Sequence, residues 1–169
     1  MNRNVEKSNK GIVIRPFTPE DVDFIISSQL KLYEVEYGFT SDIWKAYLAD
    51  GVNELVNQFN GKKDCIYILE YNGIPSGCAA VTNIDDLTAK FRFFFVNFKL
   101  RGLGAGHLLL DMSIKFCKEK RYKHVCLWTF STLEAARHLY KSKGFNITKT
   151  RENNEWGTPI IEELWKMDL

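Results

Sequence analysis

The sequence has little of what marks membrane, secreted or metal-binding proteins. It contains no run of about 18 apolar residues, so we expect no membrane span. The first ten residues are polar and lack the apolar region of a signal peptide, so we expect residues 1–10 to form a flexible tail and the protein to be cytoplasmic. The cysteines have no C-x-x-C or zinc spacing, which predicts free core thiols and no metal site; they are Cys65, Cys78, Cys117 and Cys126.

An excess of charge of one sign is also missing. Lys and Arg number 23 against 21 Asp and Glu, and the resulting net charge of +2 is spread along the chain. Such a charge is too small and too diffuse for a nucleic-acid-binding stripe, so we expect no nucleic-acid partner. The length of 169 residues suits one domain, which we place at residues 11–169, and a hydrophobic content of 45% is ordinary for a protein that builds a core.

What the sequence does contain is a glycine-rich stretch between a predicted strand and a predicted helix. Residues 91–96 are strongly β-prone, and apolar residues recur at helical spacing over residues 105–116. Glycines let the backbone turn sharply and approach a ligand closely. The first amides of a helix have no intrahelical partner, and with the helix dipole they form an anion site. A phosphate or pyrophosphate therefore fits the stretch Arg101-Gly102-Leu103-Gly104-Ala105-Gly106.

The spacing of these glycines excludes two common phosphate-binding motifs. No Lys-Ser or Lys-Thr follows them, as a P-loop requires. A Rossmann turn also fails, because its third glycine would fall at His107 or Leu109. The pattern that fits is Arg/Gln-x-x-Gly-x-Gly/Ala, met by Arg101, Gly104 and Gly106. A glycine-rich turn that binds no ligand is the alternative interpretation.

Hydrophobic periodicity and turn residues predict elements in the order β-α-α-β-β-β-α-β-α-β-β. Asn72-Gly73 is a strong hairpin signal, and Ser131 with Glu134 fits a helix capping box. The predicted strands are residues 12–17, 65–70, 77–82, 88–96, 124–130, 145–151 and 159–167, and the predicted helices are 18–37, 41–59, 104–120 and 131–144. One crossover inside a mostly antiparallel set predicts a mixed α/β (α+β) fold, with a central twisted sheet of six to seven strands and about four helices on its two faces.

The order of elements, the R-G-L-G-A-G stretch and the later A-R-H-L-Y-K-S-K-G-F segment resemble the GNAT superfamily of N-acetyltransferases over residues 11–169. The phrase L-W-T-F-S-T-L-E-A-A-R-H-L-Y is similar to the acetyltransferase half of proteins that elsewhere carry a MarR-type DNA-binding half. The resemblance implies an acetyl-CoA-dependent enzyme that acetylates a primary amine of a small molecule, peptide or protein. A module that binds or senses acyl-CoA without turnover is one alternative, and an interaction domain is another. A homodimer is left open.

The resemblance also implies where acetyl-CoA binds. Backbone amides of Arg101, Gly102, Leu103, Gly104, Ala105 and Gly106 would hold the pyrophosphate. Main chain of Phe95 and Val96 would pair with the pantetheine arm, in a gap where their strand splays from residues 124–130. Leu133 stands where the family often has Asn, so a cofactor contact there is lost or is replaced by Ser131 or Thr132.

Tyr140 matches the family tyrosine beside the thioester sulfur, which implies a general acid. A thiol has a pKa of about 8.5 and a phenol of about 10, so Tyr140 can stay protonated and donate to the departing sulfur. Position 140 also suits a helix side that faces the core, so packing is the alternative role.

The general base is not identified by the sequence. Family members often place a Glu on the strand before the glycine-rich stretch, but nothing from residue 87 to residue 100 is acidic here. Glu36, Glu155 and an ordered water are the candidates. The resemblance also implies that the first helix pair lies at the rim of the acceptor site. The candidate acceptor residues on these helices are Tyr33, Glu36, Tyr37 and Trp44.

Overall fold

The computed structural model describes residues 11–169; the predicted tail, residues 1–10, lies outside them. Seven strands form one sheet in the order β1-β2-β3-β4-β5-β7-β6. The strands are β1 (Ile12–Pro16), β2 (Cys65–Tyr71), β3 (Ile74–Asn83), β4 (Thr88–Val96), β5 (His124–Phe130), β6 (Asn146–Asn153) and β7 (Ile160–Asp168). Every neighbouring pair is antiparallel except β4 and β5. The predicted mixed, mostly antiparallel sheet is therefore confirmed.

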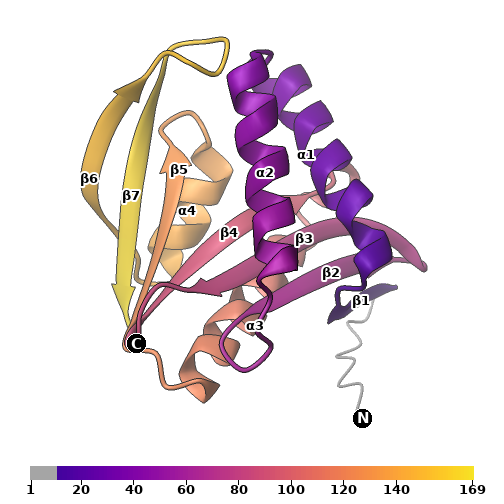
Figure 1. Ribbon diagram of the computed structural model, residues 1–169, viewed down its shortest axis with the longest axis vertical. Coiled ribbons are helices and arrows are strands. Elements are labelled where there is room, and N and C mark those ends of the chain that lie inside the picture. Colours follow the sequence, from indigo (N-terminus) through magenta and orange to yellow (C-terminus); the bar gives the residue numbers. More distant parts are fainter. Residues whose placement is uncertain (1–10) are drawn as a thin grey trace.

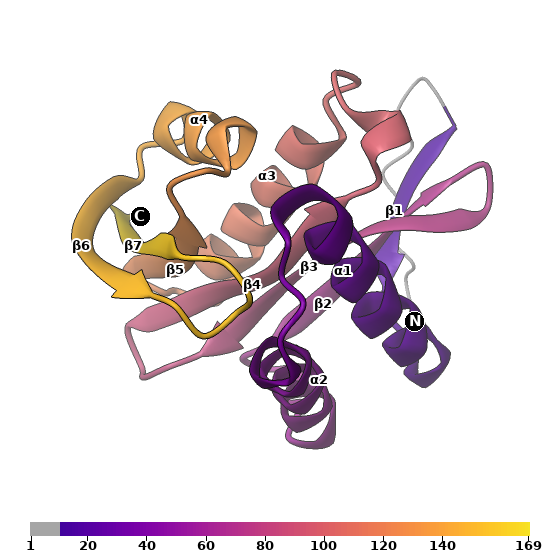
Figure 2. The same cartoon turned by 90° about the horizontal axis from the view of Figure 1, so that it is seen from above.

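Helices cover both faces of the sheet. On one face lie α1 (Val22–Tyr37) and α2 (Asp42–Asn57), and on the other lie α3 (Ala105–Glu119) and α4 (Glu134–Ser142) (Figures 1 and 2). Each face has its own apolar core, one containing Ile25 and Leu48 and the other containing Leu109 and Phe145. Among the residues that the structure describes, no helix is long and apolar enough to cross a membrane.

Several local signals in the sequence form as expected. Asn72 and Gly73 both have positive φ, 50° and 80°, as a type I′ hairpin turn requires. The Ser41 Oγ accepts a hydrogen bond from the Trp44 backbone N–H at 3.1 Å and caps α2. The four cysteines are free and buried, and burial raises the pKa of each thiol, which confirms the prediction of core thiols.

The predicted capping box at Ser131 and Glu134 is wrong. Helix α4 has Leu133 at its N-cap position, and no side chain caps it. The Ser131 backbone N–H instead donates to the Ile161 carbonyl at 2.9 Å, which extends the β5–β7 pairing by one residue. Pairing with a neighbouring strand has therefore overridden a local helix signal, because capping is worth only about 1 kcal/mol.

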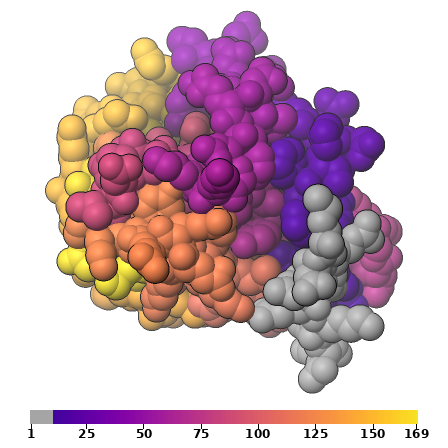
Figure 3. Space-filling model, turned by 60° about the horizontal axis from the view of Figure 1, so that its bottom comes forward, coloured from indigo at the N-terminus to yellow at the C-terminus, as the bar shows by residue number. Residues whose placement is uncertain are grey.

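Strands β4 and β5 stay together at one end and diverge at the other. Only residues 88–90 of β4 pair with residues 124–126 of β5. At the paired end, the segments of α2 (purple), of residues 115–125 (orange) and of the last strands (yellow) adjoin one another (Figure 3). Beyond residue 90 the two facing edges have no strand partner among the described residues, so their backbone groups face a gap. The structure thus has the splay that the resemblance implies.

Candidate functional site

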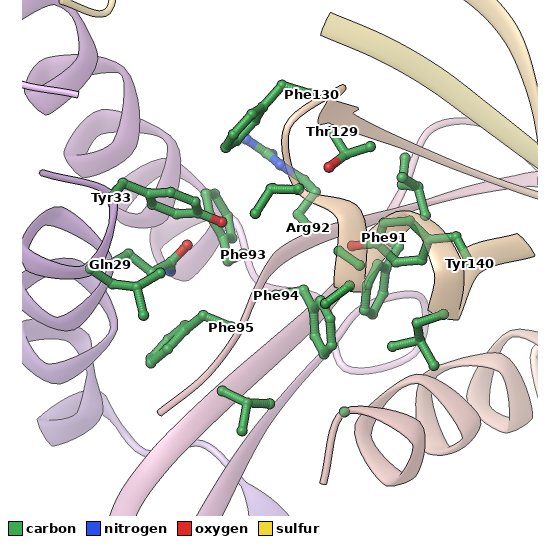
Figure 4. A pocket seen from close by; sticks show the side chains of 18 of the residues that line it. Gln29, Tyr33, Phe91, Arg92, Phe93, Phe94, Phe95, Thr129, Phe130 and Tyr140 are labelled. Carbon is green, nitrogen blue, oxygen red and sulfur yellow. The ribbon is translucent and has the colours of Figure 1, made fainter. Parts of the chain in front are cut away.

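The gap between β4 and β5 opens into a cavity of about 660 Å³. Its walls come from α1, α2, β4, β5, α4 and the glycine-rich stretch. Tyr140 and Phe91 lie on one side of the cavity in Figure 4, and Gln29 and Tyr33 lie across from them on α1. The cavity therefore joins the two faces of the sheet through the place where the strands part.

A bulge in β4 lies in the middle of this wall. Phe93 and Phe94 stand opposite the single residue Ala79 of β3, because the pairing register shifts there. Phe93 has φ 51°, in the left-handed region that bulky residues rarely adopt. Bulges of this kind re-aim side chains and are common beside active sites.

The glycine-rich stretch forms an open anion site at one end of the cavity. Gly102 and Gly104 have φ 76° and 78°, and a Cβ built on either would meet no atom within 4 Å. Glycine is therefore required there for backbone conformation, and the space above the loop is free. The backbone amides of residues 105–107 have no hydrogen-bond partner among residues 11–169. Three consecutive free amides at a helix N-terminus suit a phosphate group.

The two carboxylates that the sequence suggested as a base lie outside the cavity wall. The Arg101 Nη2 donates to both carboxylate oxygens of Glu36, at 2.7 and 2.8 Å, at the mouth of the anion site. Glu155 is exposed, and its backbone carbonyl accepts from the Ser41 Oγ at 2.5 Å. Among the described residues that line the cavity, Glu162 alone carries a carboxylate.

Most of the other predicted site residues line the cavity, and two do not. Leu103 and Ser131 do not line the cavity, whereas Leu133, which stands where the family often has Asn, does. The remaining predicted cofactor and acceptor residues do line it; they are Tyr33, Tyr37, Trp44, Phe95, Val96, Arg101, Gly102, Gly104, Ala105, Gly106 and Tyr140.

Two tyrosine hydroxyls face the cavity from opposite sides (Figure 4). Tyr140 is 5% exposed, and its ring packs against the rings of Phe145 and Trp165. Burial raises the pKa of Tyr140, and the nearby Tyr33 raises it further. Burial likewise raises the pKa of Tyr33. Neither hydroxyl has a hydrogen-bond partner among residues 11–169, and because both pKa values are raised, both hydroxyls stay protonated at neutral pH and can donate to a ligand.

Two further polar atoms in the wall are buried without a partner. They are the Thr129 Oγ1 of β5 and the Trp44 Nε1 of α2. An unpaired buried polar group costs about 1–3 kcal/mol, and such groups in a native protein call for a ligand or water. The sequence analysis missed Thr129, although a lone hydroxyl inside the apolar strand at residues 125–130 was an available signal.

The splayed sheet, the free amides at the start of α3 and the unpartnered polar groups of Tyr140, Tyr33, Thr129 and Trp44 thus lie along one cavity. The acetyltransferase (GNAT) family model matches residues 30–145, and the chain belongs to this family.

Known proteins with sequence or structural similarity agree with this family. An uncharacterized N-acetyltransferase of Methanocaldococcus jannaschii is 26% identical over 144 residues, which are 80% of this chain and 61% of that protein. The chain thus spans about three fifths of the length of this curated relative.

Two solved structures show the same fold, each covering 94% of this chain and 99% of theirs. An acetyltransferase of the GNAT family from Staphylococcus aureus has a TM-score of 0.79 at 17% identity. A GNAT family acetyltransferase from Elizabethkingia anophelis with acetyl-CoA bound has a TM-score of 0.62 at 23% identity. At such low identity these structures support the fold alone.

Proposed function

We propose that this protein transfers the acetyl group of acetyl-CoA to a primary amine of a small molecule or peptide, by direct attack of the amine on the thioester. Membership of the acetyltransferase (GNAT) family supports the reaction class. One observation carries the proposal: an unpaired strand edge runs from an open anion site at residues 101–106 toward the unpartnered hydroxyl of Tyr140.

The wall has a suitable group for each part of acetyl-CoA. The free amides of residues 105–107 would bind the pyrophosphate, and Arg101 would exchange Glu36 for a phosphate oxygen. Phe95 and Val96 pair with β3, but the edge of β4 that faces β5 has no strand partner at these residues, and its main chain would hydrogen-bond the amide groups of the pantetheine arm, as an added strand does. The side chains of Leu103 and Ser131 lie outside the wall, so we expect any contact that they make to be peripheral.

The transfer step uses one lone pair and one leaving group. The amine nitrogen attacks the thioester carbon, a carbon–nitrogen bond forms, the carbon–sulfur bond breaks, and the electron pair of that bond leaves on sulfur. The Tyr140 hydroxyl donates its proton to the sulfur. The attacking nitrogen gives up its second proton to water in the cavity, and this proton returns to the Tyr140 oxygen, so that the products are the neutral amide and the free thiol. An alkyl ammonium has a pKa near 10, so it must lose a proton before it attacks. Because Glu36 and Glu155 lie outside the wall, we propose that water in the cavity takes this proton.

Two measurements test the function and separate it from the sensing alternative. Acetyl-CoA at 100 times its dissociation constant should add about 2.7 kcal/mol to the free energy of unfolding, which a thermal melt detects. Release of free thiol from acetyl-CoA in the presence of a panel of amines should then report turnover. A melt shift without thiol release from any amine would favour an acyl-CoA sensor. No shift with acetyl-CoA, but a shift with NAD or ATP, would contradict the acetyl-CoA site.

Three further properties belong to this proposal. We propose that residues 11–169 act as a single acetyltransferase domain, because all seven strands join one sheet. A cytoplasmic location and a homodimer stay predictions, which fractionation and sedimentation equilibrium would test. The similarity of residues 127–140 to the acetyltransferase half of MarR-type fusion proteins likewise stays a prediction.

A further inference from the structure

The end of the cavity beside α1 and α2 carries positive charge that has no bound partner. Lys90 and Arg92 lie two positions apart on β4, so their side chains share one face of the sheet, and both line the cavity. Among residues 11–169 neither forms an ion pair, and the Arg92 guanidinium lies over the Phe93 ring, 4.5 Å from its centroid. Half-buried cations without a partner are costly, so they mark a place for an anion.

The one carboxylate in this wall is already bound. Glu162 is 4% exposed and accepts from the Arg151 Nε at 2.7 Å and from the Asn153 Nδ2 at 3.3 Å. Burial and the neighbouring Arg92 lower the pKa of Lys90, as expected where cations crowd together. Arg151 binds Glu162 directly and Lys90 interacts with it electrostatically, so one carboxylate of this wall serves two cations. The wall thus keeps an excess of positive charge, from Lys90 and Arg92, for a ligand.

The backbone of α2 positions the Arg92 side chain. A Cβ built on Gly51 would lie 3.2 Å from the Arg92 Nη2 and 3.3 Å from the Phe93 Cζ. The guanidinium thus lies against the backbone of α2 at Gly51, which has no side chain. In Figure 4 the Arg92 side chain extends from β4 toward the ring of Phe130. This is the side of the cavity opposite Tyr140. A group bound to Arg92 would therefore lie across the cavity from the proposed acid.

An apolar wall and a buried donor lie on the same side. Trp44 packs against Trp156 with ring centroids 4.8 Å apart, and Tyr47 packs against Trp156 at 5.4 Å. Trp44 is 5% exposed, lines the cavity and has an indole Nε1 with no hydrogen-bond partner. The indole N–H only donates, so its partner must be an acceptor, such as a carboxylate oxygen.

We propose that the acetyl acceptor is a small amino acid with an apolar side chain: its carboxylate binds Arg92 and Lys90, and its side chain packs against Trp44, Tyr47 and Trp156. The inference rests on the proposed acetyl transfer and names the acceptor of that same site. Arg binds a carboxylate through two parallel hydrogen bonds, which fixes its orientation. The same cations repel polyamines and aminoglycosides, which carry several positive charges.

Acceptor competition in a thiol-release assay tests this inference. L-Phenylalanine carries the amine, the carboxylate and an apolar side chain; phenethylamine lacks the carboxylate, and L-phenylalaninamide lacks its charge. The parent protein should give a higher kcat/KM for L-phenylalanine than for either analogue or for spermidine. Arg92→Gln should lower the ratio of L-phenylalanine to L-phenylalaninamide by roughly 10- to 100-fold, the worth of a charged hydrogen bond. Comparing ratios cancels the different basicity of the two amines.

Control variants separate loss of charge recognition from loss of fold. Lys118→Gln removes an exposed cation outside the cavity and should leave the ratio unchanged. Arg92→Lys keeps the charge without the planar fork and should restore part of the ratio. Every variant should keep the parent's melting shift with acetyl-CoA, because neither Arg92 nor Lys118 belongs to residues 101–107, which form the proposed pyrophosphate site.

Failure of the carboxylate site and failure of acetyl transfer would give different experimental results. If spermidine or phenethylamine matches L-phenylalanine and Arg92→Gln changes no ratio, the carboxylate site is overturned while acetyl transfer stands. If no amine releases thiol, acetyl transfer fails, and the fluorescence of Trp44, Trp128 and Trp156 still reports acceptor binding. Quenching by L-phenylalanine that disappears in Arg92→Gln would then support the carboxylate site, and its absence in the parent would overturn it.

Discussion

Replacing Tyr140 with phenylalanine removes one oxygen from the cavity and leaves the ring in place. The ring contacts Phe91, Phe94, Phe145 and Trp165, with centroids 5.9–6.3 Å apart, and none of these contacts needs the hydroxyl. The hydroxyl has no hydrogen-bond partner among residues 11–169. We therefore expect Tyr140→Phe to change the free energy of unfolding by no more than about 0.5 kcal/mol, and to leave acetyl-CoA affinity nearly unchanged.

The chemical step should respond very differently. A positioned acid is worth about 10²–10⁴ in rate, which corresponds to about 2.7–5.4 kcal/mol in the activation barrier. Because burial raises the pKa of Tyr140, the hydroxyl stays protonated in ordinary assay buffers. Deprotonation of Tyr140 should therefore not limit the parent's rate at neutral or mildly alkaline pH, and any rise in rate with pH should come from the acceptor amine.

Single-turnover kinetics of thiol release is the appropriate assay, because slow product release would hide a change in chemistry. Tyr33→Phe is the matched control, since it removes the other unpartnered hydroxyl that faces the cavity. A normal single-turnover rate in Tyr140→Phe would refute the acid role and leave Tyr140 as a packing residue. A slow rate in Tyr33→Phe together with a normal one in Tyr140→Phe would reassign the proton donor.

Four other changes have defined outcomes. Gly104→Val should abolish acetyl-CoA binding in calorimetry, because a branched residue resists φ 78° and its side chain fills the open space above the loop. Arg101→Ala should weaken binding only roughly tenfold, since the free amides remain. Leu109→Ala, at a fully buried position, should cost about 2–5 kcal/mol in urea unfolding. The hydrogen bond from Arg15 lowers the pKa of Asp21, so the stability that Asp21 provides over Asp21→Asn should be present above about pH 4 and lost below it.

Sequence reasoning worked where the signal is local. The glycines at 102 and 104 were expected to permit unusual backbone angles, and both have positive φ. The helix predicted to end at residue 144 ends at Ser142, and the Phe145 N–H donates to the Tyr140 carbonyl at 3.1 Å in a Schellman-type cap around Gly144, which has φ 99°. Such signals depend on a few adjacent residues, so one sequence is enough to identify them.

Sequence reasoning failed where the outcome depends on distant partners. Ser131 is a residue type that often caps helices. Its conformation is instead decided by its backbone pairing with Ile161, which lies thirty positions later in the sequence. Glu36 forms an ion pair with Arg101, which holds its carboxylate away from the cavity wall. The sequence around either residue contains no signal that predicts this ion pair. Lys90 and Arg92 are visible as charges in an apolar strand, yet only the splay from β5 turns them toward a cavity.

The two proposed substrates contact opposite faces of strand β4, because side chains alternate between the faces along the strand. Side chains alternate along a strand, so Lys90 and Arg92 point to the α1–α2 face while Phe91 packs on the α3–α4 face near Tyr140. A shift of one residue in the pairing with β3 would exchange these sets and bury both cations in the core that contains Leu109. The paired end of β4 and β5 fixes the register, and the bulge at Phe93 is confined to the part of β4 that has no β5 partner. The bulge therefore does not change the face of β4 on which Lys90 and Arg92 lie.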